Sequence, residues 1–139
     1  MPPTQQTIQV QTKGRGLHEI TGAVEQVVAE AGVKGPGLLV VFVQHTSASL
    51  TIQENADPSA RRDLEVWLNN LVRDGDPLYT HTMEGQDDMP SHIKAALTAT
   101  SLTIPIVGGR LGLGTWQGLY LWEHRIRPHR RRVLVHVTG

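Results

Sequence analysis

The sequence predicts a single α+β domain, residues 1–139, with roughly seven strands and three helices. Strand-like segments outnumber segments with helical spacing, and they dominate the C-terminal half. The two kinds of segment follow one another in mixed order, which favours α+β over a doubly wound sheet. A length of 139 residues suits one domain whose core needs no disulfide.

The N-terminal part contains three predicted strands and one predicted helix. Residues 5–12 alternate apolar and polar side chains, as in a strand with one solvated face. Residues 20–31 follow helical spacing and precede Gly32, which is typical of a helix C-terminus. Residues 38–45 begin with six apolar residues and predict a central strand, and residues 49–54 alternate again.

The second predicted helix begins at Pro58, with Asp57 as its capping residue. An irregular polar loop, 79–88, separates it from a short third helix whose first residue is predicted to be Pro90. The glycines of 108–114 indicate a tight hairpin, because glycine accepts positive φ. The remaining predicted strands are 101–107, 115–124 and 132–138.

The composition excludes several classes of function. The chain has no cysteine, so it has no disulfide framework and no thiolate metal site. Its formal net charge is zero, which argues against general nucleic-acid binding. The longest apolar run has six residues, and the N-terminus lacks the basic and apolar regions of a signal peptide. We therefore expect a cytoplasmic protein with no membrane or nucleic-acid partner.

The segment 79–97 is the richest in ionisable side chains: five of them occupy twelve positions. Imidazoles are common metal ligands, and carboxylates complete a metal shell or act as bases. The spacing of the two histidines matches no standard zinc signature. The alternative is a solvated loop in which one aspartate caps the next helix. The five residues are His81, Glu84, Asp87, Asp88 and His92.

His45 ends the apolar run and has two interpretations. A lone histidine at a strand end is more often a hydrogen-bonded structural group. If His45, His81 and His92 converge, three imidazoles and an open position make a catalytic zinc shell. These histidines favour zinc over magnesium as the divalent metal. The spacing alone leaves the choice between the two interpretations open.

Other polar groups lie near the end of the chain. Trp116 can stack on a flat ring and Gln117 can hydrogen-bond to it, although a core tryptophan is commoner. Five arginines within 125–132 can hold phosphate, or can form a solvated turn. Glu123, inside an aromatic strand, requires an arginine or a metal as partner.

Three long motifs closely resemble the YjbQ family, often labelled secondary thiamine-phosphate synthase. They are QHTSASLTIQENADPSARRDLE, HTMEGQDDMPSHIKAAL and GTWQGLYLWEHR, and the resemblance runs from about Arg15 to Gly139. It implies a β-sandwich of about seven strands in two sheets, and a homotrimer. It also implies an enzyme that joins a pyrimidine pyrophosphate to a thiazole phosphate, giving thiamine phosphate and pyrophosphate.

The motif positions, with the arginine cluster, give the expected site. The expected metal ligands are His45, His81 and His92, and the expected catalytic groups are Glu84, Asp88 and Glu123. A small-molecule substrate is expected to contact Thr46, Ser47, Asn55, Asp57, Asp87, Gly114, Thr115, Trp116, Gln117 and Arg131. Two other functions stay open: a metal-assisted hydrolase of a small phosphate or acyl substrate, and a non-catalytic trimeric protein that binds a small ligand.

Overall fold

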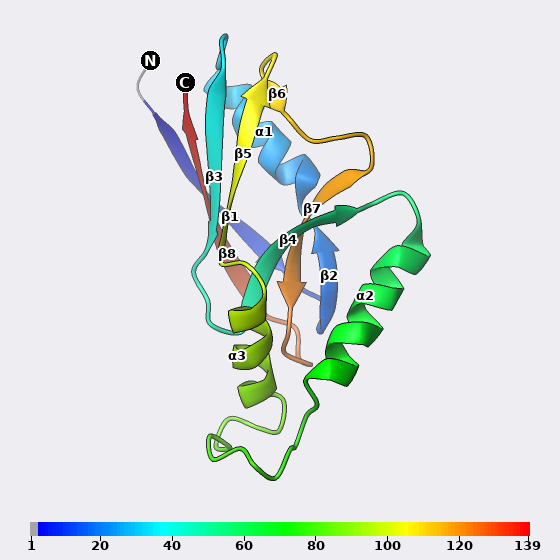
Figure 1. Cartoon of the computed structure of the whole chain (residues 1–139). Helices are drawn as coiled ribbons and strands as arrows, with labels where there is room; N and C mark the ends of the chain where they lie inside the picture. Colours follow the sequence, from blue (N-terminus) through cyan, green and yellow to red (C-terminus); the bar gives the residue numbers. More distant parts are fainter. Residues whose placement is uncertain (1–2) are drawn as a thin grey trace.

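The computed structural model describes residues 3–139, and in this range it contains three helices and eight strands (Figure 1). The strands form two antiparallel sheets, one of five strands and one of three. The predicted α+β sandwich is therefore confirmed. None of the helices in this range is long and apolar enough to cross a membrane.

The larger sheet has the order β1-β8-β3-β5-β6. Its central strand, β3, is the apolar run, and only alternate residues of it are buried. The other side chains, Leu38, Val40 and Phe42, are 49, 37 and 41% exposed. The sheet therefore has an apolar outer face. Its strands are β1 (Thr4–Gln11), β3 (Gly37–Val43), β5 (Ser101–Val107), β6 (Arg110–Leu111) and β8 (Arg130–Thr138).

The smaller sheet has the order β2-β7-β4 and is covered on both faces. Its strands are β2 (Gly16–Glu19), β4 (Ala48–Glu54) and β7 (Gln117–Glu123). One face joins the inner face of the larger sheet and helix α1 (Thr21–Ala31) in the main core. The other face packs Tyr120 and Trp122 against Leu68 of helix α2 (Pro58–Leu71). As a result β7 is buried from Gly118 to Glu123.

Local sequence signals account for most of the element boundaries. Asp57 Oδ1 accepts a hydrogen bond from the backbone N–H of Ser59 (2.9 Å) and caps α2, as predicted. Gly108 and Gly109 have φ of 59° and 78° and form the two-residue turn between β5 and β6. The short strands β2 and β6 were not predicted, because two to four residues show no usable periodicity.

Helix α3 (Asp88–Leu97) begins two residues earlier than predicted. Pro90 is therefore its third residue rather than its first. Asp87 is the N-cap, but its side chain makes no capping hydrogen bond. The carboxylates of Asp87 and Asp88 instead face Arg125, in the segment that follows β7. This start gives Asp88 and His92 their positions one helical turn apart.

Candidate metal centre

The structure brings His81, Asp88 and His92 to one point. His81 comes from the loop between α2 and α3, while Asp88 and His92 lie at i and i+4 on the same face of α3. His81 Nε2 is 2.9 Å and His92 Nε2 is 3.3 Å from Asp88 Oδ2. One ligand atom from each residue lies within 4.8 Å of the others. Three nitrogen and oxygen donors therefore converge.

The chemistry of this donor set fits zinc. Ligands about 2.0–2.1 Å from a tetrahedral ion are about 3.3 Å apart, close to the two separations above. His92 Nδ1 lies 3.0 Å from the carbonyl oxygen of Thr46, to which an N–H at Nδ1 donates. That contact leaves Nε2 free to ligate, the arrangement usual for metal-bound histidines. Two histidines and one carboxylate leave a fourth position open, as in catalytic zinc sites.

Arg125 holds the carboxylates of Asp87 and Asp88 at this candidate centre. Its Nη1 donates to Asp88 Oδ1 (2.9 Å), and its Nε donates to Asp87 Oδ2 (3.0 Å). Its Nη2 donates to the carbonyl oxygen of Glu84 (2.8 Å) and to Asp87 Oδ1 (3.3 Å). Burial opposes ionisation of Asp87, but hydrogen bonds from Arg125 and the Ile126 N–H outweigh it and lower the pKa of Asp87. Arg125 thus fixes the orientation of Asp88 towards the histidines.

Glu84 lies in the same loop, three residues after His81. Its backbone oxygen is bound by Arg125, while the residue itself is exposed. Within residues 3–139 its carboxylate has no ion-pair partner. A carboxylate free in this way, three residues from His81 in the same loop, suits a general base.

His45 lies outside this group, although sequence reasoning placed it with His81 and His92. Its Nε2 accepts a hydrogen bond from the backbone N–H of Arg132 (2.8 Å), and its Nδ1 lies 3.4 Å from Arg131 Nη1. Burial, followed by the charge of Arg131, lowers the pKa of His45. Within residues 3–139 the third donor of the convergent group is Asp88.

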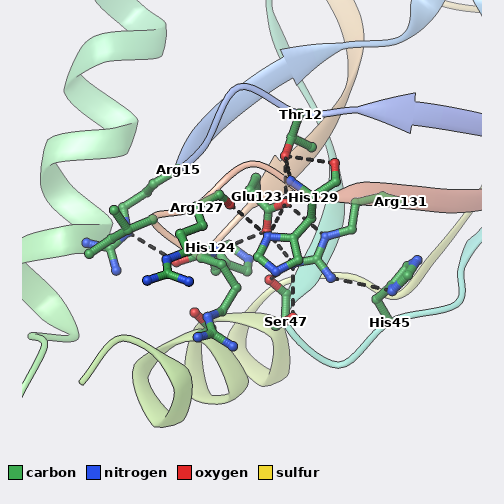
Figure 2. A network of polar contacts seen from close by, with 12 residues as sticks. Thr12, Arg15, His45, Ser47, Glu123, His124, Arg127, His129 and Arg131 are labelled. Atoms are coloured by element: carbon green, nitrogen blue, oxygen red, sulfur yellow. Dashed lines mark hydrogen bonds and ion pairs between the residues drawn. The ribbon is translucent and has the colours of Figure 1, made fainter. Parts of the chain in front are cut away.

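Glu123 and Arg131 form the centre of a second, buried network (Figure 2). Arg131 Nε donates to Glu123 Oε1 (2.9 Å), Arg131 Nη2 donates to Glu123 Oε2, and Thr12 Oγ1 donates to Glu123 Oε1 (2.8 Å). Glu123 therefore has the arginine partner that its position required. Arg131 Nη2 also donates to the Ser47 carbonyl (3.2 Å) and to Ser47 Oγ (3.0 Å). Since Thr46 precedes Ser47, this network positions the carbonyl that His92 contacts.

Sequence reasoning predicts a catalytic role for Glu123, but the position of its side chain does not suit that role. Its side chain is fully buried, and both of its oxygens accept hydrogen bonds. A carboxylate so enclosed orients its neighbours and does not reach a substrate in this conformation. Sequence reasoning did not single out Thr12 or Arg125. Arg125 does lie within the arginine-rich segment 125–132 that it identified.

The other expected substrate residues lie at the opposite end of the smaller sheet. Asn55, Gly114, Thr115 and Gln117 line a cleft of about 590 Å³ beside α1. The seven residues of β4 separate this cleft from the segment 45–47, a distance of roughly 20 Å at about 3.3 Å per residue. Asp57 and Trp116 line a neighbouring hollow of about 480 Å³. One chain therefore does not bring these residues to the metal centre.

Comparison with known proteins gives a consistent result over nearly the whole chain. The family described as "UPF0047 protein YjbQ-like" matches residues 6–139. A UPF0047 protein of Synechocystis is 56% identical over 135 residues, covering 97% of this chain and 91% of that protein. YjbQ of Escherichia coli O157:H7 is 44% identical over 135 residues, covering 97% of each chain.

Solved structures agree with the fold. A conserved hypothetical protein of Thermus thermophilus has a TM-score of 0.83 at 35% identity, covering 94% of this chain and 97% of that one. A YbjQ-like protein of Sulfolobus solfataricus P2 has a TM-score of 0.89 at 23% identity, covering 99% and 98% of the two chains. The similarities concern family and fold, and they carry no reaction and no metal.

Proposed function

Given that this chain belongs to the YjbQ-like UPF0047 family, we propose that it is a zinc-dependent hydrolase of small molecules. The observation that carries the proposal is the convergence of His81, Asp88 and His92, in a segment that also contains the exposed Glu84. Zinc held by three protein groups supplies a Lewis acid and lowers the pKa of water towards neutrality. Hydrolysis adds the OH of water to the substrate carbonyl or phosphorus and the proton to the leaving group.

Each residue of the centre has a separate task in this proposal. His81, Asp88 and His92 are the ligands. Glu84 takes up the water proton and passes it to the leaving group. Arg125 is a positioning residue that holds Asp88 by the hydrogen bond between Nη1 and Oδ1 (2.9 Å).

Metal analysis tests the ligand set directly. Purified protein reconstituted with zinc is expected to hold one ion per chain, and Asp88→Asn and His92→Asn are expected to lose it. His136→Asn is the matched control, because His136 lies on β8 and contacts Gln5 rather than the centre. His45→Asn is expected to keep the zinc. Retention of zinc by Asp88→Asn, or its loss in His45→Asn, would contradict this ligand set.

Zinc binding should also raise the free energy of unfolding. At zinc concentrations about 100 times the dissociation constant, the gain is about 2.7 kcal/mol. Arg125→Lys breaks the paired contacts to two carboxylates, and we expect about a tenfold loss in zinc affinity. Urea unfolding with and without zinc measures the first effect, and calorimetric titration of folded protein measures the second. An unchanged zinc affinity in Arg125→Lys would contradict the positioning role of Arg125.

A second candidate function is the transferase reaction that joins a pyrimidine pyrophosphate to a thiazole phosphate. The specific observation in its favour is that Arg127, Arg130 and Arg132 are exposed on the segment that begins at Arg125. Such guanidinium groups suit a pyrophosphate leaving group. Pyrophosphate release from the two substrates, lost in Arg127→Ala, would support it. Acyl hydrolysis without any pyrophosphate release would discard it.

We also propose that the chain assembles as a homotrimer through the apolar outer face of the larger sheet. Leu38, Val40 and Phe42 form that face and are exposed in the single chain. Val40→Asp is expected to yield monomers in sedimentation velocity. Val66→Asp, at an exposed valine of α2, is the control and should keep the assembly. A monomeric wild-type protein would refute the proposal.

A further inference from the structure

A cavity of about 300 Å³ lies beside the metal centre, within the loop that joins α2 to α3. It shares the side chain of His81 with the centre. Its volume is at the lower end of the range for small-molecule sites. The cavity and the open ligand position are therefore next to the same imidazole.

The loop around this cavity is a closed, ordered structure. Its two ends meet where the Gly75 N–H donates to the Gln86 carbonyl (3.1 Å). Gly75 has a φ of 68°, and a Cβ there would lie 3.3 Å from the Gln86 side chain, so a glycine suits the position. The Tyr79 hydroxyl donates to the Arg73 carbonyl (3.2 Å). Compact loops with joined ends are frequently functional.

The lining of the cavity is part apolar and, among the described residues, contains no lysine or arginine. Pro77, Tyr79 and Met89 supply the apolar part, and Thr82 and Gln86 supply neutral hydrogen-bonding groups. Among the residues that line it within the described range 3–139, none is a lysine or arginine, and one, an aspartate, is acidic. Phosphate groups are normally held by cations or by convergent N–H groups. This cavity therefore does not suit a phosphorylated group.

Arg125, at the metal centre, is not available to bind a phosphate group either. All three nitrogens of the Arg125 guanidinium already donate to Glu84, Asp87 or Asp88. The guanidinium is also largely buried, with 18% of the side chain exposed. A phosphate at the open position would therefore meet the charge of the proposed zinc alone, because use of Arg125 would displace an existing ion pair.

We infer that the cavity holds the uncharged, part-apolar group of a small acyl substrate, an ester, amide or lactone, whose carbonyl lies at the open ligand position. The inference rests on the proposed hydrolase and narrows its substrate class from phosphate or acyl to acyl. Water then adds its OH to the acyl carbon, and the released oxygen or nitrogen takes the proton. Asp76, on the cavity wall, repels substrates with a negative tail.

Binding of two matched probes tests this assignment without any turnover. Benzohydroxamate and 4-carboxybenzohydroxamate share the zinc-binding group and differ in the charge of the ring substituent. Calorimetry on the zinc-loaded protein is expected to show benzohydroxamate binding at least about tenfold more tightly, about 1.4 kcal/mol. Asp76→Asn is expected to reduce that ratio. Its amide oxygen can still accept the hydrogen bond that Asp76 Oδ1 receives from the Leu78 N–H.

A cavity-filling variant completes the test. Thr82 is exposed at the cavity, so Thr82→Trp is expected to fold, keep its zinc and bind benzohydroxamate at least about tenfold more weakly. Zinc-loaded wild-type protein that binds both probes equally, or a Thr82→Trp variant with unchanged affinity, would overturn the inference and leave the hydrolase standing. Absence of zinc binding would overturn the hydrolase and this inference together.

Discussion

The buried histidine of the strand end, His124, predicts a specific response to acid. It is 1% exposed, and its Nε2 lies 2.8 Å from Ser49 Oγ. Burial, then the charges of Lys94, Arg131 and Arg15, lower the pKa of His124 from 6.5 to about 3. The native protein therefore keeps His124 neutral over a pH range in which the unfolded chain protonates it.

The sign and size of the change in stability with pH follow from proton linkage. Between pH 6.5 and pH 3 the unfolded chain binds one more proton than the native protein at this residue, so stability is full above pH 6.5 and falls with acid. A shift of about 3.5 pKa units at about 1.36 kcal/mol each gives roughly 5 kcal/mol in total. By pH 4.5, two units below the unfolded value, about 2.7 kcal/mol of it is lost.

Urea unfolding of wild-type protein and His124→Asn at pH 7 and pH 4.5 measures this effect. Other acid-sensitive groups are common to both proteins, so the difference between them isolates His124. We expect wild type to lose about 2.7 kcal/mol more than the variant between the two pH values. Equal losses would refute the reasoning, as would an NMR titration in which the His124 imidazole protonates near pH 6.5.

Three further predictions concern other buried or capping groups. Burial lowers the pKa of Lys94, which is 1% exposed, from 10.5 to about 8. Wild type should therefore gain about 3 kcal/mol relative to Lys94→Met between pH 8 and pH 10.5, as urea titrations will show. Glu123→Gln leaves the buried Arg131 charge without its counter-charge. This substitution should lower the free energy of unfolding by about 3–5 kcal/mol. A loss below about 1 kcal/mol would contradict the pairing. Asp57→Ala removes the α2 cap and should cost about 1 kcal/mol, whereas Asp63→Ala on the exposed face of α2 serves as the control.

The elements that sequence reasoning predicted well are those specified by neighbouring residues. Asp57 and Pro58 mark the start of α2, and Gly32, with φ of 63°, marks the end of α1. The start of α3 was misplaced because Pro90 is a strong local signal. Tertiary ion pairs with Arg125 extend the helix backwards to Asp88.

The site was only partly predictable, because contacts between distant segments, rather than neighbouring residues, bring its side chains together. His81 and His92 were identified from the density of ionisable groups, but their convergence depends on how a loop folds back onto α3. Asp88, expected as a catalytic group or a cap, lies between the two imidazoles because it is one turn from His92 on the helix. His45 faces Arg132 and Arg131 across the strand end, a contact that spacing does not encode.

In the zinc site that we propose, the contacts of Arg125 with Asp87 and Asp88 affect how metal would be exchanged. Zinc fingers lose their structure when the ion leaves, because their site does not exist without it. Here Arg125 holds the Asp88 carboxylate at 2.9 Å and is itself held by Asp87 at 3.0 Å. We therefore expect a chelator to empty the proposed zinc site and leave the fold intact. Occupancy of that site should follow the free zinc concentration reversibly rather than being fixed when the chain folds.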